Sequence, residues 1–251
     1  MLPKILSLLA LLSVSAQAGS NSVVNLSHYD EGRPNFAQMK GEGVIAAIHE
    51  ATYPSFTQDS EYGSRQNAAA RAGLLWGAYH FGNADDPVRQ ADHLLEVVGS
   101  HWRRAETRPP GVLLVLDFEE NNHYPGGTMR VEQAVAFIKR IQQKTGKYPG
   151  LYSNENRIKQ VLNSPKVDSE SKQVLQKCWL WIANYHYKPE STGPWSKWHL
   201  WQYTGDGICD LPRKSYPVNL ANLRKVERNI FEGSAGALRD FWQERSWVPG
   251  L

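Results

Sequence analysis

Cysteine is scarce in this chain, with only two among 251 residues. Two cysteines exclude a disulfide scaffold and a zinc or iron–sulfur site built from several thiolates. Charge of one sign is not concentrated anywhere, because 28 basic and 25 acidic residues are spread along the chain. A nucleic-acid partner therefore has no electrostatic support. The eight histidines form neither an H-x-H nor an H-E-x-x-H spacing, so we expect no metal ion and no cofactor.

Motifs for nucleotide binding and for nucleophilic catalysis are also missing. Neither G-x-G-x-x-G nor G-x-x-x-x-G-K-[ST] follows an early strand, and no G-x-S-x-G turn occurs. Neither cysteine stands in a setting typical of a catalytic nucleophile. Aromatic residues, in contrast, are abundant, with 9 Trp and 11 Tyr. Such side chains suit core packing and also stacking against sugar rings.

The N-terminus carries a short apolar run. Lys4 precedes Ile5–Ala16, and Ala16-Gln17-Ala18 has the small-x-small pattern that a signal peptidase reads. The run is shorter than the roughly 20 apolar residues that a membrane span needs. We therefore expect residues 1–18 to be a secretory signal peptide cleaved near Ala18-Gly19. The mature chain would be secreted or periplasmic, without a membrane anchor.

Short apolar strands alternate with amphipathic helices from Val23 onward. This alternation predicts a parallel sheet, either doubly wound or closed into a barrel, and the missing nucleotide loops favour the barrel. The sequence thus predicts an α/β fold, an irregular (β/α) TIM-like barrel, as a single domain over residues 19–251. Strands are expected over Val23–Leu26, Val44–Glu50, Leu74–Phe81, Val112–Phe118, Tyr148–Ser153, Trp179–Tyr185 and His199–Tyr203, and helices over Phe36–Lys40, Tyr62–Ala72, Pro87–Val98, Met129–Lys144 and Ala235–Arg245.

Two carboxylates stand at the end of the most apolar strand. Asp117 and Glu119 should point the same way, with Phe118 on the other side, because side chains alternate along a strand. That end of a barrel strand is the active-site face. Two close carboxylates do not both ionise readily, so one can serve as general acid for a glycosidic oxygen. The alternative is a pair that caps the next helix or forms a salt bridge.

Aromatic residues gather where several of the predicted strands end. Tyr79, Tyr152, Tyr185 and Trp201 each stand near the end of a different strand. A ring of aromatics around a carboxylate pair is typical of a glycan site. Each of them taken singly is equally consistent with core packing.

These features, taken in order along the chain, resemble the family 25 glycoside hydrolases, the Chalaropsis-type lysozymes. The resemblance covers Val24 to about Trp242. It implies a barrel-like β/α fold and hydrolysis of the β-1,4 bond between N-acetylmuramic acid and N-acetylglucosamine in peptidoglycan. The blocks that carry it are Asn25-Leu26-Ser27-His28-Tyr29, Ala51-Thr52, Asp59, Ala72-Gly73-Leu74, Gly77-Ala78-Tyr79-His80-Phe81, Gln90-Ala91-Asp92, Leu116-Asp117-Phe118-Glu119, Tyr148-Pro149-Gly150-Leu151-Tyr152, Leu180-Trp181-Ile182-Ala183, Trp198-His199-Leu200-Trp201-Gln202-Tyr203 and Arg228-Asn229-Ile230-Phe231-Glu232-Gly233-Ser234.

The resemblance also implies roles for individual residues. Glu119 is similar in position to the general acid, and Asp117 to the partner that orients the substrate's 2-acetamido group for attack on the anomeric carbon. This substrate-assisted route retains the anomeric configuration without a covalent glycosyl-enzyme. Tyr79, Tyr152 and Trp201 would form walls of the sugar groove, and Tyr185 and Gln202 would complete the substrate-binding set.

Three positions depart from the family's pattern where it lines the active site. Asn25 and Glu227 stand where Asp is usual, and Glu50 stands where Lys is usual. We hypothesise that Asn25 donates its amide to the Glu50 carboxylate, so that the local negative charge has moved one strand over. The departures leave three functions open: a muramidase acting on peptidoglycan glycan strands, a non-catalytic peptidoglycan-binding protein, and a glycosidase for another N-acetylated glycan such as chitin. The sequence does not identify an inhibitor or immunity protein.

Cys178 and Cys209 are predicted to form a disulfide. One precedes the strand over Trp179–Tyr185, and the other lies in the loop after Trp201-Gln202-Tyr203. These two strands are consecutive and should be neighbours in the sheet. An oxidising compartment would permit the bond.

Overall fold

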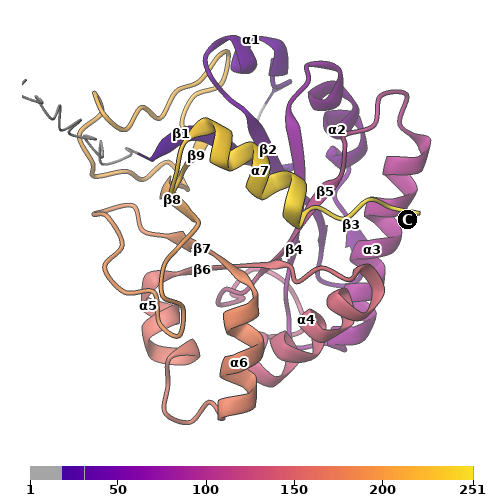
Figure 1. Cartoon of the computed structure of the whole chain (residues 1–251), viewed down its shortest axis with the longest axis vertical. Coiled ribbons are helices and arrows are strands. Elements are labelled where there is room, and N and C mark those ends of the chain that lie inside the picture. The colour runs from indigo at the N-terminus through magenta and orange to yellow at the C-terminus, as the bar shows by residue number, and fades with distance from the viewer. Residues whose placement is uncertain (1–18, 31, 251) are drawn as a thin grey trace, which may run out of the picture.

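The computed structural model describes residues 19–30 and 32–250 (Figure 1). The signal peptide expected over residues 1–18 lies outside the described residues. Within the described part of the chain, no helix is both long enough and apolar enough to cross a membrane.

The sheet closes into a barrel. Nine strands are described, in the order β1-β9-β8-β7-β6-β5-β4-β2-β3. The pairing of β1 with β2 closes eight of them into a ring, and the short β3 lies outside the ring, paired with β2. This confirms the predicted α/β barrel-like fold. The strands are β1 Ser20–Leu26, β2 Ala46–Tyr53, β3 Thr57–Gln58, β4 Leu75–Phe81, β5 Val112–Asp117, β6 Gly150–Asn154, β7 Trp179–Ala183, β8 Leu200–Thr204 and β9 Glu227–Phe231.

The barrel is irregular on the side of its last strands. β9 runs antiparallel to both of its neighbours, β1 and β8, whereas the other adjacent barrel strands are parallel. An antiparallel connection needs no crossover helix. Among the described residues, accordingly, the segment 205–226 between β8 and β9 contains no helix. The described connection 184–199 also contains no helix, although it joins the parallel pair β7 and β8.

Helices cover the outside of the remaining strands. The start of α3 follows from its sequence, because the Asp86 side chain accepts hydrogen bonds from the backbone of Val88 and Arg89, and Pro87 occupies the first turn. This helix continues six residues past the expected end at Val98. Residues 155–162 and 169–177 are helical although no helix was expected there. The helices are α1 Phe36–Gly41, α2 Tyr62–Arg71, α3 Pro87–Arg104, α4 Val131–Thr145, α5 Glu155–Arg157, the π-helical turn η1 Ile158–Leu162, α6 Ser169–Lys177 and α7 Ala235–Arg245.

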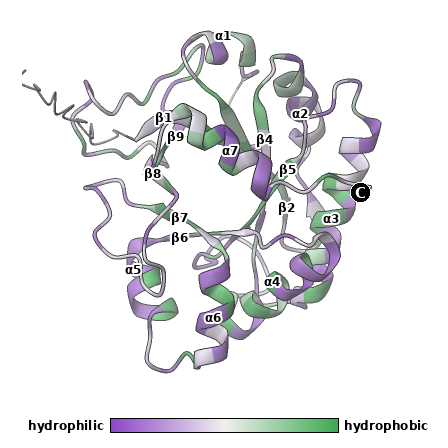
Figure 2. Cartoon of the chain, in the orientation of Figure 1, coloured by the Kyte–Doolittle hydropathy of each residue, from purple (hydrophilic) through white to green (hydrophobic). Residues whose placement is uncertain are grey.

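Side chains alternate between the barrel interior and the layer beneath the helices. In β5, Leu113 and Val115 pack inside the barrel, whereas Leu114 and Leu116 pack under the helices. Figure 2 shows hydrophobic residues along the strands and a mixture of hydrophobic and hydrophilic residues along α3 and α4. Two apolar layers therefore hold the barrel, one inside it and one around it.

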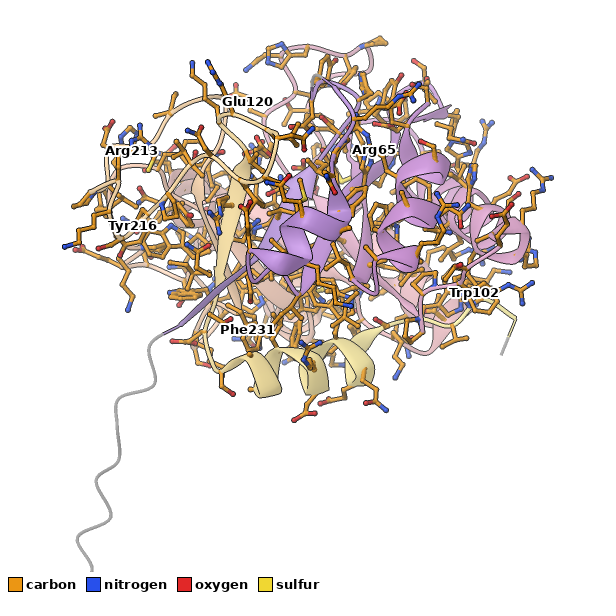
Figure 3. The ribbon with its side chains drawn as sticks, turned by 90° about the horizontal axis from the view of Figure 1, so that it is seen from above. Arg65, Trp102, Glu120, Arg213, Tyr216 and Phe231 are labelled. Atoms are coloured by element: carbon orange, nitrogen blue, oxygen red, sulfur yellow. The ribbon has the colours of Figure 1, made fainter. Side chains whose placement is uncertain are left out.

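The last helix closes one end of the barrel. Leu238, Phe241 and Trp242 of α7 are buried among the interior side chains, and the Trp242 indole N–H donates to the Trp76 carbonyl at 2.9 Å. The chain just after α7 pairs with the first residue of β5, so α7 lies at the N-terminal ends of the parallel strands. In Figure 3, Glu120, which follows β5, lies on the opposite side of the molecule from α7. A site inside the barrel can therefore open only at the C-terminal ends of these strands.

The predicted disulfide is wrong, because Cys178 and Cys209 are both buried free thiols. Cys178 lies between α6 and the start of β7, whereas Cys209 follows the end of β8. The two strands are parallel neighbours. The two cysteines therefore stand at opposite ends of the barrel, too far apart for the short Cα separation that a disulfide requires.

Candidate active site

A cavity of about 510 Å³ opens at the C-terminal end of the barrel. Inward-facing side chains of the barrel strands and residues of the following loops line it. Nine of the ten residues proposed from the sequence for catalysis or substrate binding are among the lining residues: Asn25, Glu50, Tyr79, Asp117, Glu119, Tyr152, Tyr185, Gln202 and Glu227.

Strand register brings the central residues of this cavity together. Asp117 pairs with Phe81 of β4 on one side and with Tyr152 of β6 on the other, and Tyr152 pairs with Trp181 of β7. Residues paired across parallel strands point to the same face of the sheet. One carboxylate is thereby placed among three aromatic rings, and the Tyr152 and Trp181 rings meet edge to face at 4.6 Å.

The two carboxylates at the end of β5 both favour their protonated forms. Asp117 is buried, and its Oδ1 accepts no hydrogen bond from the described residues. Burial, followed by the nearby charge of Glu119, raises the pKa of Asp117 well above its usual value. Burial also raises the pKa of Glu119, although Asn154 Nδ2 donates to its Oε1 at 3.3 Å and opposes the shift. Both shifts favour retention of a proton by the pair, as a general acid requires.

Gln202 fixes the phenol groups on one wall of the cavity. Its Oε1 accepts hydrogen bonds from the hydroxyls of Tyr152 and of Tyr185, the latter at 3.0 Å. Its Nε2 donates to Asn25 Oδ1 at 3.2 Å and to Glu227 Oε2 at 3.1 Å. Gln202 is almost fully buried, so all four groups depend on its position.

Asn25 donates its amide to Glu227 and not to Glu50, so the hypothesised Asn25–Glu50 hydrogen bond is wrong. The reason is register: Asn25 stands directly opposite Glu227 in the antiparallel pair β1–β9, whereas its partner in β2 is Ile48. Asn25 Oδ1 also accepts from Asn229 Nδ2 at 2.9 Å. Burial raises the pKa of Glu227 to about 8 despite the hydrogen bond from Asn25.

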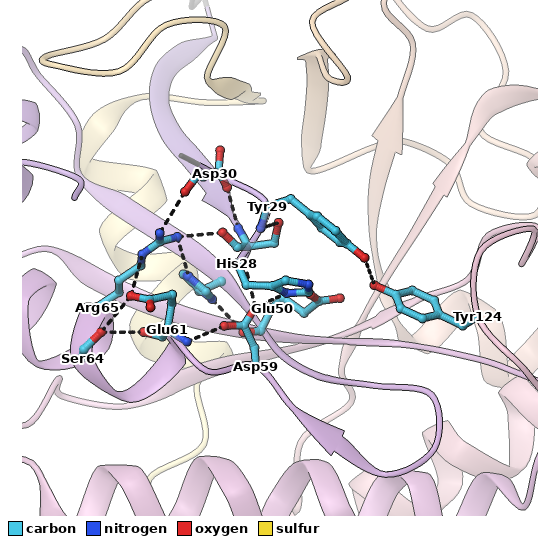
Figure 4. Close-up of polar contacts among 11 residues, drawn as sticks. His28, Tyr29, Asp30, Glu50, Asp59, Glu61, Ser64, Arg65 and Tyr124 are labelled. Carbon is cyan, nitrogen blue, oxygen red and sulfur yellow. Dashed lines mark hydrogen bonds and ion pairs between the residues drawn. The ribbon is translucent and has the colours of Figure 1, made fainter. Parts of the chain in front are cut away.

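Glu50 lies on the opposite side of Asn25 from Glu227, near the loop that follows β1. Burial, and then the Asp59 carboxylate, raise the pKa of Glu50 to about 9. Its Oε2 lies 3.1 Å from His28 Nδ1. Figure 4 shows Glu50 together with His28 and Asp59.

Trp201 does not line the cavity, which corrects the sequence prediction for this residue. Gln202 faces the interior, so its neighbours in β8 must face outward. Trp201 is 1% exposed and packs in the outer apolar layer, where its indole N–H donates to the Asn184 carbonyl at 2.8 Å. Trp181 supplies the tryptophan of the cavity instead, with its indole N–H donating to Asn229 Oδ1 at 2.7 Å.

Sequence reasoning missed several lining residues. Trp181 could have been found, because it alternates with Trp179 in an apolar strand and both therefore face the same side. The sequence did not show whether that side is the barrel interior. The loop residues had no such signal, because a loop has no fixed side-chain period. The missed lining residues are Ser27, Tyr29, Asp30, Phe81, His123, Tyr124, Trp181, Asp206, Gly207 and Lys225.

Comparisons with known proteins identify the family to which the chain is similar. The family model described as Glycosyl hydrolases family 25 matches residues 24–210. Lysozyme M1 from Streptomyces globisporus is 26% identical over 226 residues, which cover 86% of this chain and 69% of that protein.

Solved structures share the fold at lower identity. The bacterial lysozyme from Streptomyces coelicolor is 23% identical, with a TM-score of 0.69 over 93% of this chain and 100% of that chain. A muramidase from Acremonium alcalophilum is 21% identical, with a TM-score of 0.64 over 88% of this chain and 98% of that chain. The family match includes the β5 carboxylates and most of the cavity, and on this ground the chain belongs to family 25 of the glycosyl hydrolases.

Proposed function

We propose that this glycoside hydrolase is a secreted or periplasmic muramidase. It would cleave the β-1,4 bond between N-acetylmuramic acid and N-acetylglucosamine in the glycan strands of peptidoglycan. The observation that carries the proposal is the pair Asp117 and Glu119, which stands at the C-terminal end of β5 in an aromatic-lined cavity. Lysozymes and a muramidase among the similar proteins support the same substrate class.

In this proposal Glu119 is the general acid. It gives its proton to the glycosidic oxygen while the carbonyl oxygen of the substrate's 2-acetamido group attacks the anomeric carbon. The bond to the leaving sugar breaks, and an oxazolinium ion forms within the substrate. Glu119, now ionised, then takes a proton from water, which opens the ring and leaves the anomeric configuration retained.

Asp117 would act as the positioning partner of the acetamido group. Its buried Oδ1 has no hydrogen-bond donor among the described residues, so an acetamido N–H can donate to it. Such a donor favours the ionised form of Asp117 and leaves the shared proton on Glu119. The pair then has one anionic and one protonated member, as the substrate-assisted route requires.

The aromatic residues would hold the sugar rings. Tyr79, Tyr152, Trp181 and Tyr185 all line the cavity, whose volume of about 510 Å³ lies within the range usual for small-molecule sites. The hydroxyls of Tyr152 and Tyr185 are oriented by Gln202, so the faces of both rings have fixed directions. Flat rings in fixed positions favour stacking against the apolar faces of pyranoses.

The test is to incubate the purified mature chain, residues 19–251, with peptidoglycan and to identify the new reducing-end sugar after borohydride reduction. Reduced N-acetylmuramic acid is the expected product, and Glu119→Gln and Asp117→Asn serve as matched inactive controls. Reduced N-acetylglucosamine would indicate a different bond. Products from chitin but not from peptidoglycan would indicate the other N-acetylated glycan. Binding without any product would indicate a non-catalytic peptidoglycan-binding protein.

A further inference from the structure

Three metal-ligating side chains from separate segments meet at one wall of the barrel mouth (Figure 4). His28 follows β1, Glu50 belongs to β2, and Asp59 follows β3. His28 Nδ1 lies 3.1 Å from Glu50 Oε2 and 2.9 Å from Asp59 Oδ2, and the three potential ligand atoms all lie within 4.8 Å of one another. The sequence did not reveal this group, because the spacing of His28, Glu50 and Asp59 along the chain matches no common metal-binding motif.

We propose that His28, Glu50 and Asp59 form a site for a divalent transition-metal cation, with Zn²⁺ as the best match. One imidazole nitrogen and two carboxylate oxygens are ligands that Zn²⁺ accepts. Three protein ligands leave a fourth position for water or for a substrate oxygen. Glu50 also lines the catalytic cavity, so the ion would stand at its wall.

The spacing of the ligand atoms fits a tetrahedral ion. Ligands about 2.0–2.1 Å from zinc, placed at tetrahedral angles, lie about 3.3 Å from one another. The distances from His28 Nδ1 to the carboxylate oxygens of Glu50 and Asp59, 3.1 and 2.9 Å, fall short of that by only a few tenths of an ångström. Small side-chain rotations therefore suffice to admit the ion.

Glu50 supplies an independent reason for a ligand at this place. The residue is 2% exposed, and its Oε2 accepts no hydrogen bond from the described residues, although it points at the His28 ring. A buried carboxylate oxygen without a donor is destabilising. A cation bound between Glu50, His28 and Asp59 would give this oxygen a partner.

Among the residues that the structure describes, no lysine or arginine forms an ion pair with Glu50 or Asp59. Among the described residues, His28 is the only basic side chain within 4.0 Å of either Glu50 or Asp59. Arg65 lies nearby, but its NH1 and NH2 groups donate to the backbone carbonyls of Ser27 and Asp30. Buried carboxylates are normally paired or coordinated to a metal.

The surroundings hold the proposed ligands in place. Asp59 Oδ1 accepts from the backbone of Glu61 at 2.8 Å, and Asp59 Oδ2 accepts from the backbone of His28 at 2.8 Å. The His28 ring stacks on Tyr53, with the centroids 5.2 Å apart and the planes at 28°. Such contacts orient ligands before the ion arrives, which raises metal affinity.

The test is calorimetric titration of the chelator-treated mature chain with Zn²⁺, together with visible absorption spectra of the Co²⁺-substituted protein. We expect one ion per chain with micromolar or tighter affinity, and an intense Co²⁺ spectrum typical of tetrahedral coordination. His28→Ala and the nearly isosteric Glu50→Gln should each weaken binding at least tenfold. His186→Ala is the matched control, because His186 contacts one carboxylate, Asp210, at 2.6 Å on the surface, and it should bind as the unmodified chain does.

Either of two results would overturn the proposal. One is the lack of saturable binding below millimolar Zn²⁺, which would mean that the three side chains only share protons. The other is unchanged affinity in Glu50→Gln, which would place any bound ion elsewhere. Circular dichroism of each variant confirms that it is folded before its affinity is compared. No step of this test depends on hydrolysis, so its outcome is independent of the proposed muramidase activity.

Discussion

Replacing Asn25 by Asp tests the contact that most clearly separates the structure from the sequence hypothesis. The change is isosteric and keeps the acceptor Oδ1, which receives hydrogen bonds from Gln202 and Asn229. It removes the amide that donates to Glu227 and places a second carboxyl group against that residue. We expect a loss of stability that grows as the pH rises.

The size of the effect follows from the charges. Burial raises the pKa of Glu227 to about 8 from its ordinary 4.5, so the folded chain binds a proton that the unfolded chain has released. Stability therefore falls as the pH rises between these two values, even in the unmodified chain. Two carboxylates about 3 Å apart repel by roughly 5 kcal/mol at an effective dielectric constant of 20. Because Glu227 is partly exposed, we expect an additional loss of about 2–3 kcal/mol at pH 9 and less than about 1 kcal/mol at pH 5.

The assay is urea unfolding of Asn25→Asp and of the unmodified chain at pH 5, 7 and 9. Adding Glu227→Gln should remove the extra pH dependence, because an amide again faces the new carboxylate. Adding Glu50→Gln should leave most of it in place. Asn163→Asp, at an exposed position after η1, is the matched control for the change of net charge.

Two results would refute this reasoning. If the stability difference between Asn25→Asp and the unmodified chain stays constant from pH 5 to pH 9, the two carboxyl groups are not in contact. If Glu50→Gln restores the pH profile and Glu227→Gln does not, the pairing originally expected from the sequence is correct and the β1–β9 register is wrong.

Three further outcomes are expected. Glu119→Gln should lower the rate of peptidoglycan hydrolysis at least a hundredfold while leaving the thermal unfolding midpoint nearly unchanged, because the amide delivers no proton; a rate within tenfold of the original would contradict its role as acid. Trp181→Phe should weaken binding of glycan fragments, measured by titration, whereas Trp201→Phe should lower stability by roughly 1–3 kcal/mol without changing that affinity; the reverse pattern would restore Trp201 to the groove. Cys178 and Cys209 should both react with a thiol reagent in urea, and only slowly in the folded protein, since both are buried; an unreactive pair that responds after reduction would establish the disulfide.

The position of the two carboxylates at the end of β5 could be predicted from the sequence alone. The apolar run before Asp117 and Glu119 is typical of a buried strand, and the alternation of side chains puts both carboxylates on the same side. The succession of strands and helices predicts a barrel whose active-site face contains that strand end. These inferences depend on local periodicity, which can be recognised from the order of neighbouring residues.

For other strands, the sequence did not show which side chains face the barrel interior. In β8, Trp201 and Gln202 are both plausible cavity residues by type, and only one of them can face inward. β7 is buried on both faces, so its composition does not show which residues face the interior. The packing of neighbouring strands decides this question, which is why Trp181 and not Trp201 lines the cavity.

Contacts between distant segments were decided only by the tertiary structure. β9 inserts antiparallel between β1 and β8, and this register places Glu227 opposite Asn25. The parallel pairing of β7 with β8 likewise separates the two cysteines. Sequence carries the residue types and the local periods, whereas the direction and register of strand pairing depend on closing the whole barrel, so the partners of Asn25 and Cys178 follow from the assembled fold.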